Sequence, residues 1–231
     1  MKILVIVPAY NEEGNIPSVL NDLNNNFPRG DVIVINDGSQ DKTSELARTY
    51  GINVIDLSYN IGIGGAIQTG FLYAMSKNYD VAIQFDGDGQ HLAKEIPKLL
   101  RPHIENGADL VVGSRFLSDG SYNPSVQRRI GAKVLSLIVL LLIRKKITDT
   151  TSGFRLYSKK AMQFFSSIYP DDYAEVEALV LAHKKGLTIE EVATQMNPRM
   201  TGQSSITISR AVYYMVKVVL AIFIIMIKRI R

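Results

Sequence analysis

The sequence contains no cysteine. Disulfide bonds and cysteine-ligated zinc or iron are therefore excluded, and the composition is consistent with a reducing compartment. The first apolar run, Ile3–Val7, is short, ends at Pro8 and has no small-residue cleavage site after it, so it does not predict a signal peptide. We therefore expect the catalytic part of the protein in the cytoplasm.

A strong excess of charge is also missing. The 231 residues carry a formal net charge of +4. Nucleic-acid-binding proteins usually concentrate basic and aromatic residues on one face, and this mild excess does not indicate a nucleic-acid partner. It suits anionic substrates or an anionic membrane surface. The length allows one large domain with a full core, and no internal repeat or low-complexity linker interrupts it.

Long hydrophobic runs are few, and the first lies at residues 134–143. As a helix this run covers about 15 Å, which is too short for a bilayer core of roughly 30 Å. Basic residues follow it at 144–146. The sequence therefore predicts a helix over 130–146 that is either buried in the core or lies in the membrane interface.

The second apolar run covers residues 211–227, contains Lys217 and precedes a basic C-terminus. It is just short of a comfortable membrane span, and spanning from the cytoplasm would put its basic end outside. For residues 206–231 we predict an anchoring helix that lies in the membrane plane or re-enters, or a span that needs a membrane partner. Burial in a soluble core is the alternative.

Short apolar runs alternate with helical patterns along the first half of the chain. This alternation predicts βαβ units and a mostly parallel sheet covered by helices, which is an α/β fold. A further segment at 188–192 could add an edge strand. The predicted strands of the first half are 3–7, 32–35, 54–57, 81–85 and 110–112.

Polar loops follow four of these strands, at residues 8–13, 36–39, 60–66 and 86–90. Because ligands of open α/β sheets bind beyond the carboxyl ends of the strands, the loops are expected to line one cleft. Tyr10 could stack on a base, and Asp37 could accept a hydrogen bond from a base N–H. The glycines of 60–66 resemble a phosphate loop, but their spacing argues against a dinucleotide dehydrogenase and a P-loop NTPase.

The loop Asp86-Gly-Asp88-Gly-Gln90 is the centre of this arrangement. Two carboxylates one residue apart can share a hard divalent cation, and Gln90 adds a neutral oxygen. The glycines allow a phosphate to approach the backbone. An ordinary Asp-Gly surface turn is the alternative reading of the same residues.

Six motifs occur in a fixed order and carry a family resemblance. The sequence resembles the family 2 inverting glycosyltransferases with the GT-A fold over roughly residues 1–205. The polyprenyl-phosphate branch, typified by dolichyl-phosphate mannose synthase, is the most similar. The motifs are Pro8-Ala-Tyr10-Asn-Glu12, Asn36-Asp37-Gly38-Ser39, Asn60-x-Gly62-x-Gly64, Asp86-x-Asp88-Gly-Gln90-His91, Gly113-Ser-Arg115 and Ser152-Gly-Phe-Arg155.

The resemblance implies a GT-A domain at 1–205 followed by C-terminal membrane-associated helices, and a role for each matched residue. The residues implied to bind the donor nucleotide are Pro8, Tyr10, Glu12, Asp37, Gly64 and Asp86. The residues implied to bind Mg²⁺ or Mn²⁺ are Asp86, Asp88 and Gln90. Phosphates of donor or acceptor would be bound by Arg115, Arg128 or Arg129, Ser152, Arg155 and, on a loop resembling the family's mobile active-site loop, Arg199. Asn36 stands where the family often has an acid, which leaves the assignment of Asp37 open.

The chemistry of a lipid-phosphate acceptor does not require a strong general base, because its second pKa of about 6 makes it largely anionic at neutral pH. Asp88, Asp149 and Arg115 are the predicted catalytic residues. Asp149 is the candidate acid/base or positioning carboxylate, with a loop or cap role as the alternative. We expect His91 behind the metal loop, and Glu175 and Glu177 on a solvated helix face or at the acceptor site.

The resemblance therefore predicts transfer of one sugar from a nucleotide sugar to a polyprenyl phosphate with inversion, for envelope glycan synthesis. UDP-GlcNAc or UDP-glucose is favoured over GDP-mannose. The expected location is the cytoplasmic face of the cell membrane, with a small membrane protein or a second copy as further partners. Three alternatives are a hydroxyl acceptor, a silent nucleotide-sugar-binding subunit and a nucleotidyltransferase; the last is disfavoured because Pro8–Gly14 has no basic residue.

Overall fold

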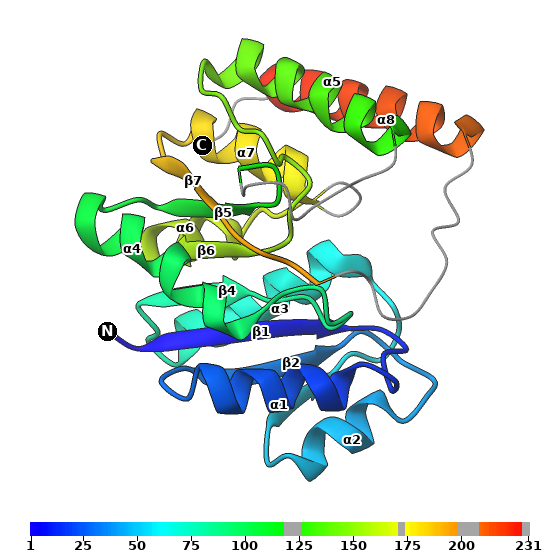
Figure 1. Ribbon diagram of the computed structural model, residues 1–231, viewed down its shortest axis with the longest axis vertical. Coiled ribbons are helices and arrows are strands. Elements are labelled where there is room, and N and C mark those ends of the chain that lie inside the picture. Colours follow the sequence, from blue (N-terminus) through cyan, green and yellow to red (C-terminus); the bar gives the residue numbers. More distant parts are fainter. Residues whose placement is uncertain (118–125, 171–173, 198–207, 228–231) are drawn as a thin grey trace.

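The computed structural model describes residues 1–117, 126–170, 174–197 and 208–227. Within these residues, seven strands form one sheet in the order β3-β2-β1-β4-β6-β5-β7 (Figure 1). The strands are β1 (Ile3–Ala9), β2 (Asp31–Asn36), β3 (Asn53–Asp56), β4 (Val81–Gln84), β5 (Leu110–Ser114), β6 (Arg155–Ser158) and β7 (Ile189–Ala193). The helices are α1 (Ile16–Asn26), α2 (Thr43–Thr49), α3 (Gly62–Ser76), α4 (Ile96–Asn106), α5 (Val126–Ile143), α6 (Lys159–Phe165), α7 (Ala174–Lys184) and α8 (Ile208–Ile227), with a short 3₁₀ turn at Ala93–Glu95.

The predicted strands of the first half and the predicted edge strand are present. β1 pairs in parallel with β2 and β4, and β7 pairs in parallel with β5 at the sheet edge. The structure adds a strand that the sequence did not predict. β6 lies between β4 and β5 and runs antiparallel to both, whereas the sequence predicted that the loop ending at Arg155 would lead directly into a helix.

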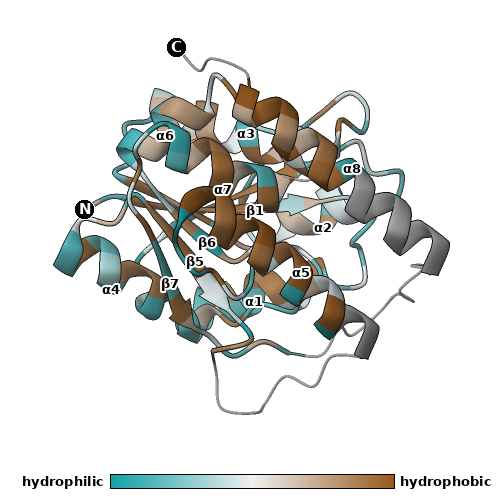
Figure 2. Ribbon diagram, turned by 90° about the horizontal axis from the view of Figure 1, so that it is seen from above, coloured by the Kyte–Doolittle hydropathy of each residue, from teal (hydrophilic) through white to brown (hydrophobic). Residues whose placement is uncertain are grey.

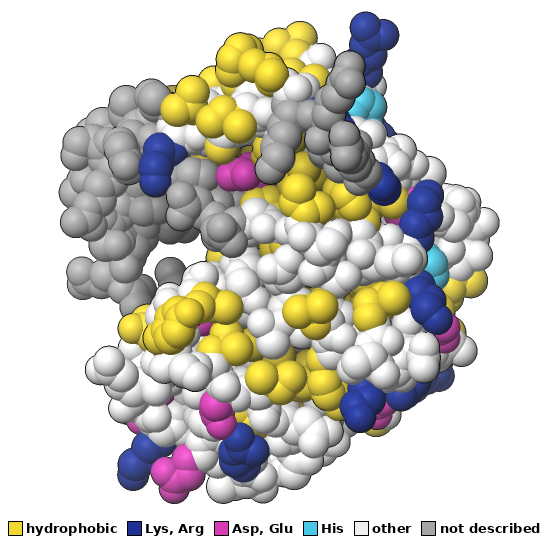
Figure 3. Space-filling model, turned by 180° about the vertical axis from the view of Figure 1, so that it is seen from behind, with side chains coloured by type: hydrophobic (Ala, Val, Ile, Leu, Met, Phe, Trp, Pro, Cys, Tyr) yellow, Lys and Arg dark blue, Asp and Glu magenta, His cyan; other side chains and the backbone are white. Residues whose placement is uncertain are grey.

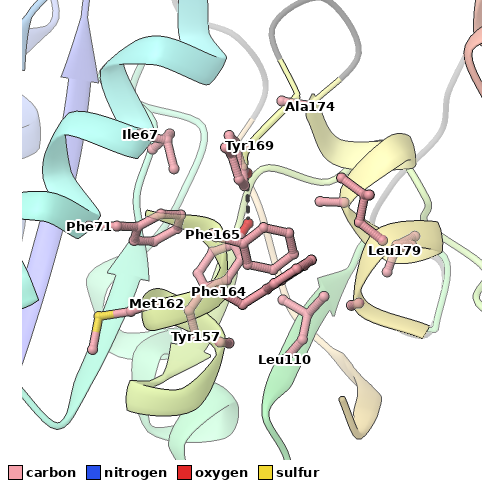
Figure 4. Packing of buried hydrophobic residues seen from close by; sticks show 14 of the residues in the cluster. Ile67, Phe71, Leu110, Tyr157, Met162, Phe164, Phe165, Tyr169, Ala174 and Leu179 are labelled. Carbon is pink, nitrogen blue, oxygen red and sulfur yellow. Dashed lines mark hydrogen bonds between the residues drawn. The ribbon is translucent and has the colours of Figure 1, made fainter. Parts of the chain in front are cut away.

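The sheet separates two layers of helices. Alternate side chains of β1 point to opposite faces: Val5 belongs to the core cluster that includes residues of α1, α2 and α4, whereas Ile6 belongs to the cluster that includes residues of α3, α6 and α7. Burial on both faces explains why the strands read as continuous apolar runs. An aromatic cluster of Phe71, Tyr157, Phe165 and Tyr169 fills the space between α3, α6 and β6 (Figure 4).

The two apolar helices of the C-terminal half both pack on α7 (Figures 1 and 2). The helix predicted at 130–146 is α5, and it begins and ends a few residues earlier. Val218 and Ile222 of α8 are buried, and the Lys184 Nζ of α7 donates hydrogen bonds to the α8 carbonyls of Ile225 (2.7 Å) and Met226 (2.8 Å). None of the helices in the described ranges is both long enough and apolar enough to cross a membrane. The predicted boundary at residue 206 stays a prediction.

The outer faces of α5 and α8 leave large apolar side chains exposed. Figure 3 shows hydrophobic side chains gathered at the upper end of the molecule, where Figure 1 shows both helices. The exposed residues are Ile130, Val134, Leu137, Leu140 and Leu141 on α5 and Val219, Leu220, Phe223, Ile224, Met226 and Ile227 on α8. We call these side chains the apolar outer face.

Candidate active site

The carboxyl ends of β1, β2 and β4 bring the predicted loops together at one edge of the sheet. The Asn11 backbone N–H donates to Ser39 Oγ (2.9 Å), and the Gln40 N–H donates to Asn11 Oδ1 (2.9 Å). The Glu12 N–H donates to Thr43 Oγ1 (2.8 Å). These side chain–backbone bonds fix the loop after β1 against the loop after β2.

Asp37 joins the second loop to the start of α3. Its buried carboxylate accepts hydrogen bonds from the backbone N–H groups of Ile61 (2.8 Å) and Gly62 (3.0 Å). A carboxylate at a helix N-terminus is favoured by the unpaired N–H groups and the helix dipole there. The predicted glycine loop is therefore the first turn of α3, and a phosphate would compete with Asp37 for these donors.

Asn36 also organises this loop. Its Nδ2 donates to Asp56 Oδ1 (2.8 Å) and its Oδ1 accepts from the Ser39 N–H (3.3 Å). Gly38 has φ +70°, and a Cβ there would lie 2.7 Å from the Asn60 nitrogen. The close approach of the two loops thus requires glycine at this position.

The remaining predicted donor residues differ in exposure. Tyr10 is 46% exposed, which leaves its ring accessible for stacking, whereas Pro8 is buried at the end of β1. Glu12 is half-buried and its carboxylate accepts from Asn15 Nδ2 (2.6 Å). Gly64 is buried in the first turn of α3.

The predicted metal loop leaves the end of β4 and packs against neighbouring backbone. Asp86, Asp88 and Gln90 are half-buried, and the Gln90 N–H donates to Asp88 Oδ1 (3.1 Å). Within the ranges described, no three His, Asp or Glu side chains cluster as metal ligands. Two carboxylates with an amide oxygen fit Mg²⁺ or Mn²⁺ when diphosphate oxygens and water complete the shell.

His91 contacts this loop from the protein interior. It is buried, stacks on Phe154 with ring centroids 4.8 Å apart, and its Nδ1 accepts a hydrogen bond from the Asp86 N–H (3.0 Å). Burial lowers the pKa of His91 to about 4, although the Asp88 carboxylate acts in the opposite direction. The imidazole is therefore neutral at physiological pH, with its proton on Nε2.

A chain of buried polar groups reaches Asp86 from the core. Tyr169 Oη lies 2.9 Å from Tyr157 Oη, the Tyr157 hydroxyl donates to Gln84 Oε1 (3.4 Å), and Gln84 Nε2 donates to Asp86 Oδ1 (3.3 Å). Burial raises the pKa of both phenols, so both stay protonated. A Cβ on Gly153 would lie 2.5 Å from Asp86 Oδ2. Gln84 and Gly153 thus set the orientation of this carboxylate.

A bidentate ion pair lies at the end of β5. Arg115 Nε and Nη2 donate to Asp149 Oδ2 and Oδ1, each at 2.7 Å, and the Arg115 backbone N–H donates to Oδ2 (3.1 Å). Asp149 is fully buried, whereas the Arg115 side chain is 16% exposed. The loop that carries Asp149 continues to Gly153, whose Cβ position lies 2.5 Å from Asp86 Oδ2, and to Phe154, which stacks on His91, so the pair and the metal loop lie side by side.

The comparison with known families decides the class of protein. Residues 4–165 match the family model described as Glycosyl transferase family 2. The chain belongs to glycosyl transferase family 2. This confirms the predicted family and the prediction that the protein is an enzyme.

Relatives of this glycosyltransferase carry informative names. It is 35% identical to a UDP-N-acetylglucosamine–dolichyl-phosphate N-acetylglucosaminyltransferase of Methanococcus voltae, covering 82% of this chain and 83% of that protein. It is 30% identical to an undecaprenyl-phosphate mannosyltransferase of Micrococcus luteus, covering 90% and 88%. Among solved structures, glucosyl-3-phosphoglycerate synthase of Mycobacterium tuberculosis with Mn²⁺, UDP-glucose and phosphoglyceric acid has a TM-score of 0.72 at 19% identity, covering 96% of this chain and 78% of that one. This likeness shows the GT-A-like fold.

Two residues predicted to bind phosphate, Arg155 and Ser152, are buried in this glycosyltransferase and bond to backbone groups. Arg155 is fully buried, and its Nε, Nη1 and Nη2 donate to the carbonyls of Ser152 (2.7 Å), Glu175 (2.7 Å) and Thr150 (3.1 Å). Ser152 is also buried, and its Oγ accepts from the Phe154 N–H. In this arrangement Arg155 fixes the 150–152 loop to α7, and its binding of a phosphate stays a prediction.

Other predicted residues lie on α5, on α7 or outside the described residues. Arg129 is exposed on α5. The side chain of Arg128 and all of Arg199 lie outside the described residues. Glu175 and Glu177 are half-buried, and burial raises the pKa of Glu175, so Glu175 is not on a fully solvated face.

Sequence reasoning did not identify Gln84, Gly153 or Glu191 as functional residues. Gln84 is a polar residue in the apolar run of β4. Because a buried amide needs hydrogen-bond partners, its position in this run could have indicated a structural or functional role. Glu191 lies on an edge strand, where a charged residue is ordinary. Only tertiary contacts reveal its role.

Proposed function

We propose that this glycosyltransferase transfers a single sugar from a nucleotide-diphosphate sugar to a polyprenyl phosphate, with inversion at the anomeric carbon. The names of the relatives support this acceptor class, because one relative is named for dolichyl phosphate and another for undecaprenyl phosphate. The observation that carries the proposal is the Arg115–Asp149 pair beside the Asp86–Asp88 loop. One site then has a region for the donor diphosphate and a guanidinium for a second phosphate.

The donor would lie along the carboxyl ends of β1, β2 and β4. Tyr10 is accessible to stack on the base, and Asp37 holds the start of α3 in position. Asp86, Asp88 and Gln90 would hold Mg²⁺ or Mn²⁺, which when bound neutralises charge on the departing nucleoside diphosphate. The Mycobacterium tuberculosis synthase with bound Mn²⁺ and UDP-glucose supports a divalent metal and a uridine donor.

The hydrogen bonds of Asp149 agree with an acceptor that needs no general base. Both oxygens of its carboxylate accept hydrogen bonds from Arg115, so Asp149 orients a cation rather than acting as a general base. A phosphate oxygen needs no deprotonation before it attacks, because its second pKa is about 6. The new bond joins this oxygen to the anomeric carbon, and the bond to the donor diphosphate breaks with its electron pair on the leaving group. Inversion makes the product β-linked when the donor is α-linked.

The apolar outer face supports action at a membrane. Its side chains lie on α5 and α8, and the exposed cations Arg144, Lys145 and Lys146 follow α5 directly. An apolar helix face flanked by cations suits the interface of an anionic bilayer, where the phosphate of a polyprenyl lipid also lies. We propose binding at the cytoplasmic face of the cell membrane, in the synthesis of an envelope glycan.

The test is transfer from radiolabelled UDP-GlcNAc, UDP-glucose and GDP-mannose to undecaprenyl phosphate in membranes, with Mg²⁺ or Mn²⁺. We expect one donor to label the lipid and EDTA to abolish labelling, and that donor identifies the sugar and the base. Labelling of a saccharide or lipid hydroxyl instead would replace the acceptor. No label with any donor, from protein shown to be folded, would refute the proposal.

A further inference from the structure

Glu191 lies on the edge strand β7, yet its carboxylate points into a network of hydrogen bonds. Glu191 Oε1 and Oε2 accept from the Thr148 N–H (2.8 and 2.9 Å). Oε1 also accepts from Thr148 Oγ1 (2.9 Å) and from the Asp149 N–H (2.7 Å). A single side chain therefore holds two successive residues of the loop before β6.

The loop residues held by Glu191 carry the Asp149 carboxylate. Thr148 Oγ1 also lies 2.8 Å from Ser114 Oγ, at the end of β5, so the loop is tied to both neighbouring strands. Asp149 then engages the backbone N–H and two guanidinium nitrogens of Arg115. The connection runs without a gap from Glu191, through the 148–149 backbone, to the guanidinium of Arg115.

The neighbouring residue on the strand shows that this arrangement is specific to Glu191. Successive strand residues point to opposite faces of a sheet. Glu190 accepts at 3.1 and 3.3 Å from Asn106 Nδ2, in contacts exposed to solvent at the end of α4. Glu190 and Glu191 are thus neighbours in the sequence, but Glu190 contacts the end of α4 and Glu191 contacts the loop at residues 148 and 149.

We propose that Glu191 is a positioning residue for the acceptor phosphate, acting through Asp149 on the direction of the Arg115 guanidinium. This inference rests on the proposed function. Recognition of phosphate by arginine depends on the direction of its N–H groups, and holding that direction in advance reduces the entropy lost on binding. An amide at position 191 that keeps its oxygen at the Oε1 position would put an NH₂ group at the Oε2 position, facing the Thr148 N–H, so Glu191→Gln should loosen the loop while keeping the side-chain volume.

The experiment compares Glu191→Gln with the control Glu190→Gln in the full-length protein with detergent-solubilised undecaprenyl phosphate. For Glu191→Gln we expect the KM for the lipid phosphate to rise about tenfold, the range seen when groups that orient a ligating side chain are changed. The KM for the nucleotide sugar and the Tm should stay close to wild type. Glu190→Gln should match wild type in all three measurements.

A second pair of variants tests the route through Arg115. In an Arg115→Ala background, adding Glu191→Gln should cause no further rise in the acceptor KM, whereas independent effects would multiply. An unchanged acceptor KM in Glu191→Gln, equal rises in both KM values with a lowered Tm, or multiplied effects in the double variant would each overturn the inference. Wild-type protein that labels no polyprenyl phosphate would instead refute the proposed function itself.

Discussion

The two halves of the sheet hold their functional loops by different interactions. Beside β1 and β2, the loops are joined by hydrogen bonds that the side chains of Asn11, Asn36 and Asp37 accept from backbone N–H groups. Beside β5, β6 and β7, buried charged side chains hold the loops in place. Asp149 is fully buried against Arg115, and the fully buried Arg155 donates to backbone carbonyls. The donor half therefore depends on side chains that accept hydrogen bonds from loop backbone, and the acceptor half depends on guanidinium groups that donate to a buried carboxylate and to backbone carbonyls.

This difference has an energetic consequence. Removing one partner of a surface hydrogen bond usually costs little, whereas leaving a charge buried and unpaired costs about 3–5 kcal/mol. We therefore expect substitutions that remove one member of a buried ion pair in the acceptor half to lower stability as well as activity. Substitutions at the metal loop should lower activity alone.

The largest expected effect is on transfer, from Asp88→Ala. Removing a carboxylate that would hold the divalent metal against the leaving diphosphate should lower kcat about 10³-fold. The Tm should change little because Asp88 is half-buried in a loop. The control is Asp80→Ala, at the other end of β4, where the side chain is 50% exposed. Comparable activity in the two variants would remove Asp88 from the catalytic site.

The next largest effect is on folding, from Arg155→Leu. The substitution leaves the carbonyls of Thr150, Ser152 and Glu175 without their donor, and each unpaired group costs about 1–3 kcal/mol. We expect a free energy of unfolding lower by several kcal/mol in denaturant titration. The exposed Arg129→Leu serves as the control and should unfold like wild type. If Arg155→Leu were stable but raised the acceptor KM, Arg155 would be the phosphate ligand that the sequence predicted.

A smaller effect on the metal site is expected from Gly153→Ala. The new Cβ would displace Asp86, whose Oδ2 lies 2.5 Å from the position that this carbon takes in ideal geometry. We expect Mn²⁺ affinity, measured by electron paramagnetic resonance without acceptor, to fall about tenfold. Gly14→Ala is the control, because no atom lies within 4 Å of its Cβ position. Equal Mn²⁺ affinity in both variants would place the metal elsewhere.

The apolar outer face provides a test on the membrane side. Phe223 of α8 is 61% exposed, and burying a Phe side chain in a bilayer is worth about 1.5–3 kcal/mol. Phe223→Glu should therefore reduce binding to anionic vesicles at least several-fold in co-sedimentation, with nucleotide binding retained. Leu72→Glu, on α3 and 55% exposed, is the matched control. Similar vesicle binding by both variants would mean that α8 does not contact lipid.

The smallest expected effect is a pH dependence of stability from His91. Its folded pKa of about 4 lies below the ordinary 6.5, so the unfolded state binds more protons between these values. The contribution of the neutral imidazole to the free energy of unfolding is fully present above pH 6.5 and is lost as the pH falls towards 4. The Tm difference between pH 7.5 and 5 should be smaller in His91→Gln than in wild type, by on the order of 5 °C. An identical difference would mean that His91 is not buried in its neutral form.

Local patterns account for most of what could be predicted on the donor side. Continuous apolar runs predicted β1, β2 and β4, and turn residues predicted the loops after them, because each element depends on neighbours in the chain. The short strand β6 was missed because Arg155 and Ser158 at its ends read as polar. They are buried because each finds partners in segments far away in the chain.

The amino-acid sequence by itself determined the α/β class, the family and the edge of the sheet where the chemistry lies. These follow from periodicity and from motifs whose residues are close in the chain. Only the tertiary structure decided that Asp37 holds the start of α3, that Asp149 pairs with Arg115, and that Glu191 rather than Glu190 faces the site. Hydrogen bonds and ion pairs depend on distance in space, and a one-dimensional pattern does not contain the distance between residues 115, 149 and 191.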